Sequence, residues 1–585
     1  MVTSSAAEFT TPATLSETDT AYDSQDIAID GTTVTIDGAH SFNSLLLTNS
    51  AVLTHSACTT TETHKLEVTV ANGVVVDATS KVDVSGLGYI AGQTSGNTTV
   101  GGSSGGSGGS FGGLGGNWLG TANAVYGDCA DPDDWGSGGG PDLSPSAGGG
   151  LVRLEAGSLV LEGQLLANGP AAVVGAGSGG GIYVAVTNLT GGGSIHADGG
   201  NNSGNQGAGG GGRVAVYAQD YSGFDVGNIT ATGGTSGNAP GGAGTVYVKD
   251  RDEPLGLLVI DASSGGEGVT LLGLAASNTF ATAASVIIRG SNATVRLEHR
   301  GMMLDIGGSL RVEGSARMEV EGDLSVAEAL VIDGASLLAT NVRAGSVLLT
   351  NKALLTTFGP TTDQVHKLEL VVTNAVVVDA TSWIDVSGLG YLPGWTSPNT
   401  TVGASIEGFG GGAGGSYGGL GNDSRGTANA VYGGCVDPDD WGSGGRTSTF
   451  NWGTTFSGGA GGGLVRLAAG SLSLDGKLWA QWAGCGRRCW IRGWDIRGGA
   501  YAGGEREPAS QRWQQRERRL RWWRTHCGVC GGLQRVHHDE HHGGGRHGQC
   551  ARWSGHGVAD SRQGPDSRQM VHSDSKKRLV RLEHR

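Results

Sequence analysis

Cysteine is scarce in most of this chain, and charged residues make up only 16% of it. The three cysteines before residue 481 are too few for a disulfide framework. Two of them, Cys129 and Cys435, occupy equivalent places in two repeated segments, so we expect small buried side chains there rather than a bridge. No uncharged apolar run reaches the roughly 20 residues of a membrane-spanning helix. We therefore expect no membrane-spanning segment.

Helical patterns are also missing from the first 480 residues, where no capped segment with a period near 3.6 interrupts the sequence. Glycine dominates instead, with 111 of 585 residues, but without the every-third-residue period of collagen. Between the glycines run alternating apolar and polar segments of strand length, such as TVTIDG, LEVTV and GVVVDATSKVDVSG. Gly, Asn or Asp closes each of them, as in tight turns between strands. The sequence therefore predicts an all-β chain.

The net charge of −15 is unevenly distributed, because residues 481–585 hold 21 Lys and Arg against 10 Asp and Glu. The first 480 residues are therefore strongly acidic, which argues against nucleic acid as a partner. No cationic and then apolar leader follows Met1. We expect either an intracellular chain or one whose natural start lies upstream.

One stretch occurs twice, as His64–Tyr89 and His366–Tyr391, at an offset of 302 residues. The same strand pattern continues for hundreds of residues in repeats of unequal length, without a closing signature. This favours a right-handed parallel β-helix, a solenoid with long Gly-rich loops, over a sandwich or barrel. The expected divisions are a linker or broken start (1–30), a first β-helical copy (31–300), connecting rungs (301–345), an incomplete second copy (346–480), an out-of-frame segment (481–578) and an in-frame remnant (579–585).

The out-of-frame prediction rests on the tryptophans of the tail. A shift of one base turns the single Trp codon into a Gly codon, and all seven tail tryptophans fall opposite glycines of the first copy. The pairs are Trp482 with Gly169, Trp490 with Gly177, Trp494 with Gly181, Trp513 with Gly200, Trp522 with Gly210, Trp523 with Gly211 and Trp553 with Gly242. The final VRLEHR repeats residues 295–300 in the printed frame. We therefore expect no native fold for residues 481–578.

Taken at face value, the same tail offers a zinc site and a basic, Trp-rich surface for nucleic acid or membrane. The frame comparison argues against both. The zinc-ligand types concerned are Cys527, Cys530, His537, His538, His541 and His542.

Two acidic boxes with the shared sequence DPDDWGSGG remain as candidate sites. Each places three carboxylates within four residues, beside Pro and Gly, and a flexible loop of this kind can supply the oxygen ligands that Ca²⁺ prefers. The alternative is an Asp-Pro turn whose carboxylates cap backbone amides. The predicted calcium ligands are Asp131, Asp133 and Asp134 in the first box and Asp437, Asp439 and Asp440 in the second.

Other motifs give weaker indications. The Gly-rich loops lack the following helix that a phosphate cradle needs, so we expect flaps over the strands, anchored by Phe111, Leu114, Tyr417 and Leu420. His64 and His366 precede a strand in both copies and have no nucleophile nearby. Paired carboxylates for glycoside cleavage are another reading, although we expect them to face solvent. They are Asp77 and Asp83, with Asp379 and Asp385 as counterparts.

Three segments, GLVRLEAGSLVLEGQLLANG, GGGIYVAVTNLTGGGSIHADGG and GGRVAVYAQDYSGFDVGNITATGG, carry a resemblance to other proteins. They resemble the Gly-rich parallel β-helix repeat proteins of bacterial surfaces, of the adhesin or autotransporter-passenger kind. The resemblance is architectural and covers about residues 31–480. It implies an extracellular or cell-surface location and a non-enzymatic structural or adhesive role, with carbohydrate, cell-surface ligands or the chain itself as partners. The alternatives are a polysaccharide lyase or glycoside hydrolase, and a non-functional frameshifted fragment.

Overall fold

The computed structural model of the protein describes residues 6–142, 146–291, 293–408, 411–423, 426–446, 448–449 and 455–483. All of them belong to one compact unit. The predicted out-of-frame segment lies outside the described residues except for its first three positions. The six Cys and His residues considered above as zinc ligands also lie outside them.

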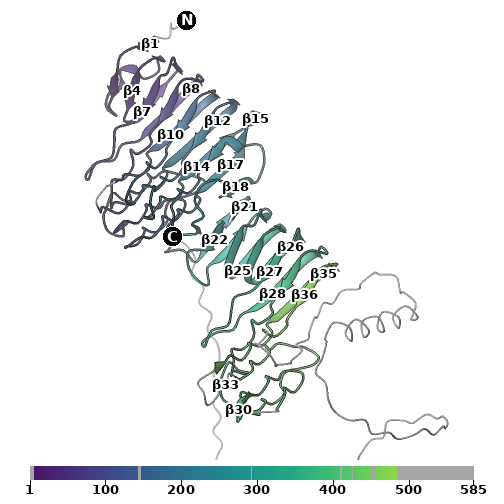
Figure 1. Cartoon of the computed structure of the whole chain (residues 1–585). Helices are drawn as coiled ribbons and strands as arrows, with labels where there is room; N and C mark the ends of the chain where they lie inside the picture. The colour runs from purple at the N-terminus through teal and green to yellow at the C-terminus, as the bar shows by residue number, and fades with distance from the viewer. Residues whose placement is uncertain are drawn as a thin grey trace, which may run out of the picture. The chain divides into compact units, whose positions relative to one another are not determined.

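Regular structure in the described part is almost entirely β-strand, and most strands pair in parallel (Figure 1). This confirms the predicted all-β class. The only helices among the described residues are two single 3-10 turns, η1 (Thr20–Tyr22) and η2 (Val226–Asn228). None of the described helices is long and apolar enough to cross a membrane.

The first group of parallel strands, which we call stack one, pairs into two sheets because alternate side chains of each strand are apolar. In β8, Leu66, Val68 and Val70 are buried while the residues between them face outward. The next strand of the same sheet repeats this pattern in register, with Leu154 opposite Val68. One sheet contains β1 (Ala6–Phe9), β3 (Asp26–Asp30), β5 (Gly38–Phe42), β6 (Ser44–Thr48), β8 (Leu66–Val76), β10 (Leu151–Leu161), β12 (Gly181–Gly191), β14 (Arg213–Ala218), β15 (Asp220–Phe224) and β17 (Thr245–Asp250).

The second sheet of stack one is made of short strands that follow the long ones in the chain. Its central positions, such as Val82 and Leu165, are buried and lie opposite one another. It contains β2 (Ala13–Leu15), β4 (Thr33–Ile36), β7 (Val52–Thr54), β9 (Lys81–Asp83), β11 (Gln164–Leu166), β13 (Ser194–His196) and β16 (Ile229–Thr230). We call one long strand with the short strand that follows it a rung.

The strands begin earlier than the sequence predicted. Residues 1–30 were expected to be a linker or broken start, but β1, β2 and β3 already pair with their neighbours. The physical reason is that Leu15, Ile27 and Ile29 are buried and continue the same apolar positions.

The parallel order is interrupted once between long strands, where β17 pairs with β18 (Gly256–Asp261) in antiparallel orientation. The buried apolar residues also divide mainly into two clusters around this point. The first core therefore ends near residue 250, whereas the repeat pattern alone places the boundary at residue 300. The chain reverses at Asp252, Glu253 and Pro254, which form a short turn between the two strands.

β18 begins stack two, whose further strands again pair in parallel. They are β19 (Val269–Leu272), β20 (Thr279–Thr282), β21 (Ala284–Arg289), β22 (Thr294–Leu297), β23 (Met303–Ile306), β24 (Leu310–Glu313), β25 (Arg317–Asp333), β26 (Ser336–Thr350), β27 (Leu354–Thr356), β28 (Lys367–Val378), β29 (Trp383–Asp385), β35 (Leu464–Leu474) and β36 (Lys477–Trp479). The second copy of the repeated stretch supplies β28 and β29, which take the places of β8 and β9.

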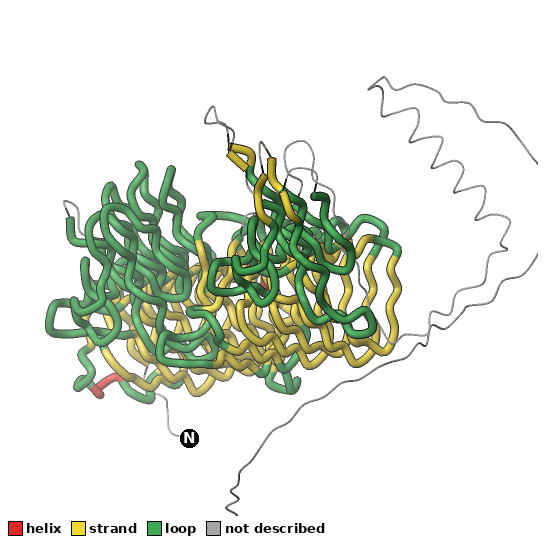
Figure 2. Tube along the Cα trace, turned by 90° about the horizontal axis from the view of Figure 1, so that it is seen from below, coloured by secondary structure: helices red, strands yellow, loops and turns green. Residues whose placement is uncertain are grey.

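The Gly-rich loops lie beside the strands (Figure 2). Many of their hydrogen bonds join backbone groups. In the first copy, the amides of Gly109 and Gly113 donate to the carbonyls of Ala176 and Gly211. Phe111 is fully buried, as predicted for an anchor, and Leu114 is half-buried. In the second copy Leu420 is 65% exposed, so the anchor predicted there is wrong. Five short strands lie in this second loop: β30 (Ile406–Gly408), β31 (Gly411–Gly412), β32 (Gly426–Thr427), β33 (Ser448–Thr449) and β34 (Thr455–Phe456).

Candidate functional site

The last aspartate of the first acidic box ties its Gly-rich loop to the strand layer. Asp134 accepts hydrogen bonds from the Tyr89 hydroxyl (2.6 Å), the Ser95 hydroxyl (2.7 Å) and the backbone amide of Trp135 (2.9 Å). The Trp135 indole donates to the carbonyl of His64 at 2.6 Å. Burial raises the pKa of Asp134, although these donors oppose that shift. The box thus holds the two ends of its loop together.

The second box repeats this arrangement with its own residues. Asp440 accepts from the Tyr391 hydroxyl (2.6 Å), the Ser397 hydroxyl (2.6 Å) and the Trp441 amide (2.9 Å). The Trp441 indole donates to the carbonyl of His366 at 2.9 Å. Because both copies make the same contacts, we refer to this set of hydrogen bonds as the loop latch.

The other carboxylates of the boxes point elsewhere. Asp131 is 60% exposed and pairs with Arg153 at 2.8 Å, and Asp437 is 68% exposed and pairs with Arg466 at 3.2 Å. Asp133 and Asp439 are exposed. Across the described residues, no group of three or more His, Cys, Asp or Glu is placed to hold a metal ion. The calcium site stays a prediction from the sequence, and the structure does not bring its three carboxylates together.

Removing the latch carboxylate should open the first loop. In an Asp134→Ala variant the Tyr89 and Ser95 hydroxyls lose their acceptor, and an unsatisfied buried donor costs about 2 kcal/mol. We expect faster hydrogen exchange across residues 89–96 and 126–137, and a Trp135 emission shifted to longer wavelength. The matched control is Asp133→Ala, whose exposed side chain makes no latch contact. Equal exchange rates in the two variants would contradict the latch.

The cysteines at equivalent positions differ in burial. Cys129 is buried, as predicted, but Cys435 is exposed, so the prediction of a buried side chain is wrong there. Neither they nor Cys58 is paired in a disulfide. Cys129 belongs to the same buried cluster as Ala215, Ala243 and Tyr247, whereas Cys435 is not part of that cluster.

The aspartates considered for glycoside cleavage serve the turns between strands. Asp77 accepts from the Asn49 amide (2.9 Å), the Thr79 amide (2.9 Å) and the Thr79 hydroxyl (2.8 Å). Desolvation opposes these hydrogen bonds but does not outweigh them, and the pKa of Asp77 falls to about 2. Asp379 has the same contacts and the same pKa. A general acid needs the opposite shift.

Asp83 and Asp385, the other two carboxylates considered for glycoside cleavage, also accept hydrogen bonds from the backbone of turns. Asp83 contacts Lys81 at 2.7 Å and accepts from the Ser85 amide, and its pKa is lowered because these bonds outweigh desolvation. Asp385 accepts from the Ser387 amide at 2.8 Å. All four aspartates therefore stabilise the backbone.

The histidines that precede the repeated strands contribute backbone carbonyls to the latch. His64 is partly exposed, whereas His366 is buried, which lowers the pKa of its imidazole. A third histidine was not singled out from the sequence. His55 Nε2 accepts a hydrogen bond from the Leu151 amide at 3.2 Å, and His55 Nδ1 lies 2.7 Å from the Ser56 carbonyl oxygen. The neutral ring therefore joins two rungs.

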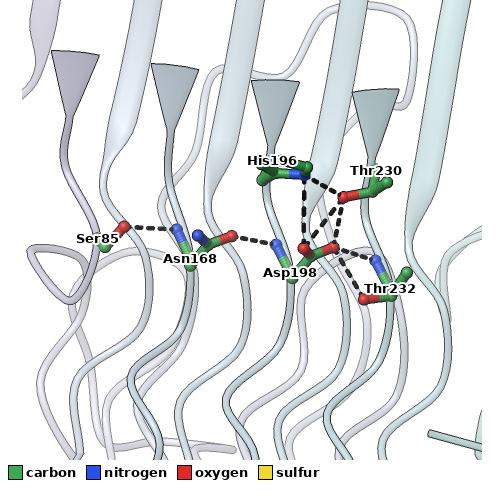
Figure 3. Close-up of polar contacts among 6 residues, drawn as sticks. All are labelled: Ser85, Asn168, His196, Asp198, Thr230 and Thr232. Atoms are coloured by element: carbon green, nitrogen blue, oxygen red, sulfur yellow. Dashed lines mark hydrogen bonds and ion pairs between the residues drawn. The ribbon is translucent and has the colours of Figure 1, made fainter. Parts of the chain in front are cut away.

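A polar cluster on successive turns of stack one was also missed from the sequence (Figure 3). The Asn168 amide donates to the Ser85 hydroxyl at 3.1 Å, and the Asp198 amide donates to the Asn168 side chain at 2.7 Å. Asp198 then accepts from the amide (2.6 Å) and hydroxyl (2.9 Å) of Thr232. We call this chain of residues the turn ladder. Its sequence signal is a polar residue directly before glycine, in VSG, ANG, ADG and ATG.

The turn ladder includes an Asp–His pair, Asp198 and His196, which both contact the Thr230 hydroxyl. The direction of these hydrogen bonds decides whether the pair could activate that hydroxyl. The Thr230 hydroxyl donates its only proton to Asp198, at 2.9 and 3.0 Å. It therefore receives a proton from His196 Nδ1, which lies 2.6 Å away. A nucleophilic hydroxyl would instead donate to the imidazole. The cluster is arranged to join turns rather than to activate Thr230.

A cavity of about 210 Å³ lies at the junction of the two stacks. Its walls are mainly apolar and include Val246, Val248 and Val259. The charged side chains lining it, Asp261 and Arg289, form an ion pair at 2.6 Å. Its remaining polar lining consists of the Tyr221 hydroxyl and a few Ser and Thr side chains.

A scan against protein-family models, a search of curated proteins and a search of solved structures each found no match.

Proposed function

We propose that this chain is a non-enzymatic structural or adhesive protein of the cell surface or extracellular space. We further propose that its two stacks are right-handed parallel β-helices with Gly-rich loops. Support for this fold comes from the parallel, in-register strands, since connections between parallel strands are right-handed in about 98% of cases. The partners we propose are carbohydrate, other surface ligands or further copies of the chain.

One observation carries the non-enzymatic part of this proposal. Three carboxylates at loops and turns, Asp77, Asp134 and Asp198, are each occupied by two or more donors from the fold itself. A catalytic carboxylate has to exchange a proton with substrate or attack it, and these groups are bound to fixed partners. A polysaccharide lyase or glycoside hydrolase is the competing hypothesis, and no described contact favours it.

The test exposes the full chain to a panel of neutral and acidic polysaccharides. We expect co-sedimentation with some of them and no release of reducing ends or unsaturated products above a heat-denatured control. Product release that disappears in an Asp77→Asn, Asp379→Asn double variant would contradict the proposal and establish an enzyme.

We separately propose that residues 481–578 are translated out of frame. The third alternative, a non-functional fragment, depends on this hypothesis. Sequencing the DNA across the codons for Ala480 and Leu579 tests it, and we expect a one-base shift near each. A clean read in the printed frame, together with stoichiometric zinc binding by the tail, would contradict it.

A further inference from the structure

The last rung of stack two has an open edge. β35 pairs with β28, and β36 pairs with β29. Within the described residues no strand pairs with the other edge of β35 or β36. Inward-facing apolar side chains are partly uncovered as a result: Leu474 is 37% exposed, and Leu478 is half-buried, whereas its counterpart Leu165 in stack one is buried. Exposed strand edges of this kind present unpaired N–H and C=O groups to any suitable partner.

Stack one shows what covers the same edge. β10 and β35 are identical at nine of eleven positions, LVRLEAGSLVL against LVRLAAGSLSL. β10 is paired on both sides, to β8 on one edge and to β12 on the other. Leu161, the counterpart of Leu474, is fully buried. The β10 edge therefore closely resembles the β35 edge in sequence, but it is covered by its partner strand β12.

A tyrosine anchors that partner strand. The register places Tyr183 of β12 beside Arg153 of β10, and the guanidinium lies 4.3 Å from the centre of the ring. Arg153 also donates to Asp131 (2.8 Å) and to the Pro132 carbonyl (3.0 Å), which fixes it against the acidic box. Cation–π contacts of this kind are worth about 0.5–2 kcal/mol.

The equivalent place in stack two holds a cavity. Arg466 pairs with Asp437 as Arg153 does with Asp131, but its side chain is 37% exposed against 19%. Beside it lies a cavity of about 400 Å³, lined by Arg466, Asp437, Pro438, Val371 and further residues of β28 and β35. In the described part of the chain, stack two thus has the arginine, the acidic box and the strand edge of the β10–β12 interface without the tyrosine strand.

We propose that the β35–β36 edge and the cavity beside Arg466 are a docking surface for a parallel rung of the β12–β13 type. The occupant is an extended segment with the sequence pattern of residues 178–200, supplied by another chain that carries this repeat. Its strand completes the open ladder, and its tyrosine occupies the cavity against Arg466. Strand addition gives affinity through backbone hydrogen bonds, and side-chain pockets give specificity. The inference does not depend on the proposed adhesive role.

The test uses the full chain and a labelled synthetic peptide of residues 178–200. We expect saturable binding at one site per chain, measured by fluorescence anisotropy, and none for a scrambled peptide. A Tyr183→Ala peptide, or an Arg466→Ala chain with the original peptide, should bind about tenfold more weakly or worse, which corresponds to about 1.4 kcal/mol. The matched control is an Arg153→Ala chain, which should keep full affinity because β12 already covers the first edge.

Three results would overturn the proposal. They are no saturable binding of the peptide, an equal loss of affinity in the Arg153→Ala and Arg466→Ala chains, and a chain that dimerises through this edge in a form that the peptide does not dissociate.

Discussion

A Gly113→Ala variant should lose about 3 kcal/mol of stability, at the upper end of the usual cost of overpacking. The new methyl carbon would stand 2.0 Å from the carbonyl oxygen of Gly242 and 2.5 Å from that of Ala243. Both are backbone atoms of the loop before β17, and each already accepts a hydrogen bond, from the Gly211 amide and the Thr270 hydroxyl respectively. Denaturant unfolding followed by circular dichroism, with hydrogen exchange of residues 108–116, measures the loss.

The chain contains a matched control for this substitution. Gly419 occupies the same place in the second copy, in SYGGLG against SFGGLG, and a methyl group added there would meet nothing within 4 Å. Neither glycine has a positive φ. Gly419→Ala should therefore leave stability unchanged or raise it by up to about 1 kcal/mol, because alanine restricts the unfolded chain. Similar losses in both variants would show that packing against the next rung is not the cause.

Stability should also fall as the pH drops from 6.5 to 4, by about 3 kcal/mol through His55 alone. Burial lowers the pKa of His55 from 6.5 to about 4, and this outweighs the raising effects of the Ser56 carbonyl and Asp37, while His64 lowers it further. Above pH 6.5 the ring is neutral in both states. Below that value the unfolded chain binds a proton that the folded chain resists, so stability is lost until pH 4. Unfolding by urea at a series of pH values measures this slope.

A His55→Gln variant separates this contribution from the other titrating groups. The glutamine oxygen can accept from the Leu151 amide but does not titrate, so the variant should lose about 3 kcal/mol less over this range. Asp77 and Asp379 titrate near pH 2, outside the window. The raised pKa of Asp134 acts in the opposite direction, and the lowered pKa of His366 acts in the same direction, in both proteins. Identical slopes in variant and wild type would contradict the role of His55.

The strands were predictable because their side chains alternate within short segments. Val74 and Val76 are buried in GVVVDATS, as the alternation requires, and Val82 and Val84 continue it in KVDVSG. The antiparallel pairing of β17 with β18 was not predictable, since both strands have the same apolar pattern as their parallel neighbours. Their relative direction is set by the short turn at Asp252–Pro254, which residue alternation does not encode.

The acidic boxes show where sequence reasoning ends. Asp131, Asp133 and Asp134 are equivalent in spacing and residue type, yet one pairs with an arginine, one faces solvent and one fastens the loop. Which role each takes depends on Tyr89, Ser95 and Arg153, which lie far away in the chain. Residue type predicted oxygen ligands, but only the fold determines whether they converge.

The turn ladder has a mechanical consequence. Each link from Ser85 through Asn168 and Asp198 to Thr232 joins one rung to the next, alongside the backbone ladder. A pulling force along the direction of stacking would therefore load side-chain and main-chain hydrogen bonds together, so that no single bond carries the whole extension. Tension resistance of this kind comes from polar residues placed before glycines, directly after buried core positions such as Val84 and Ala167.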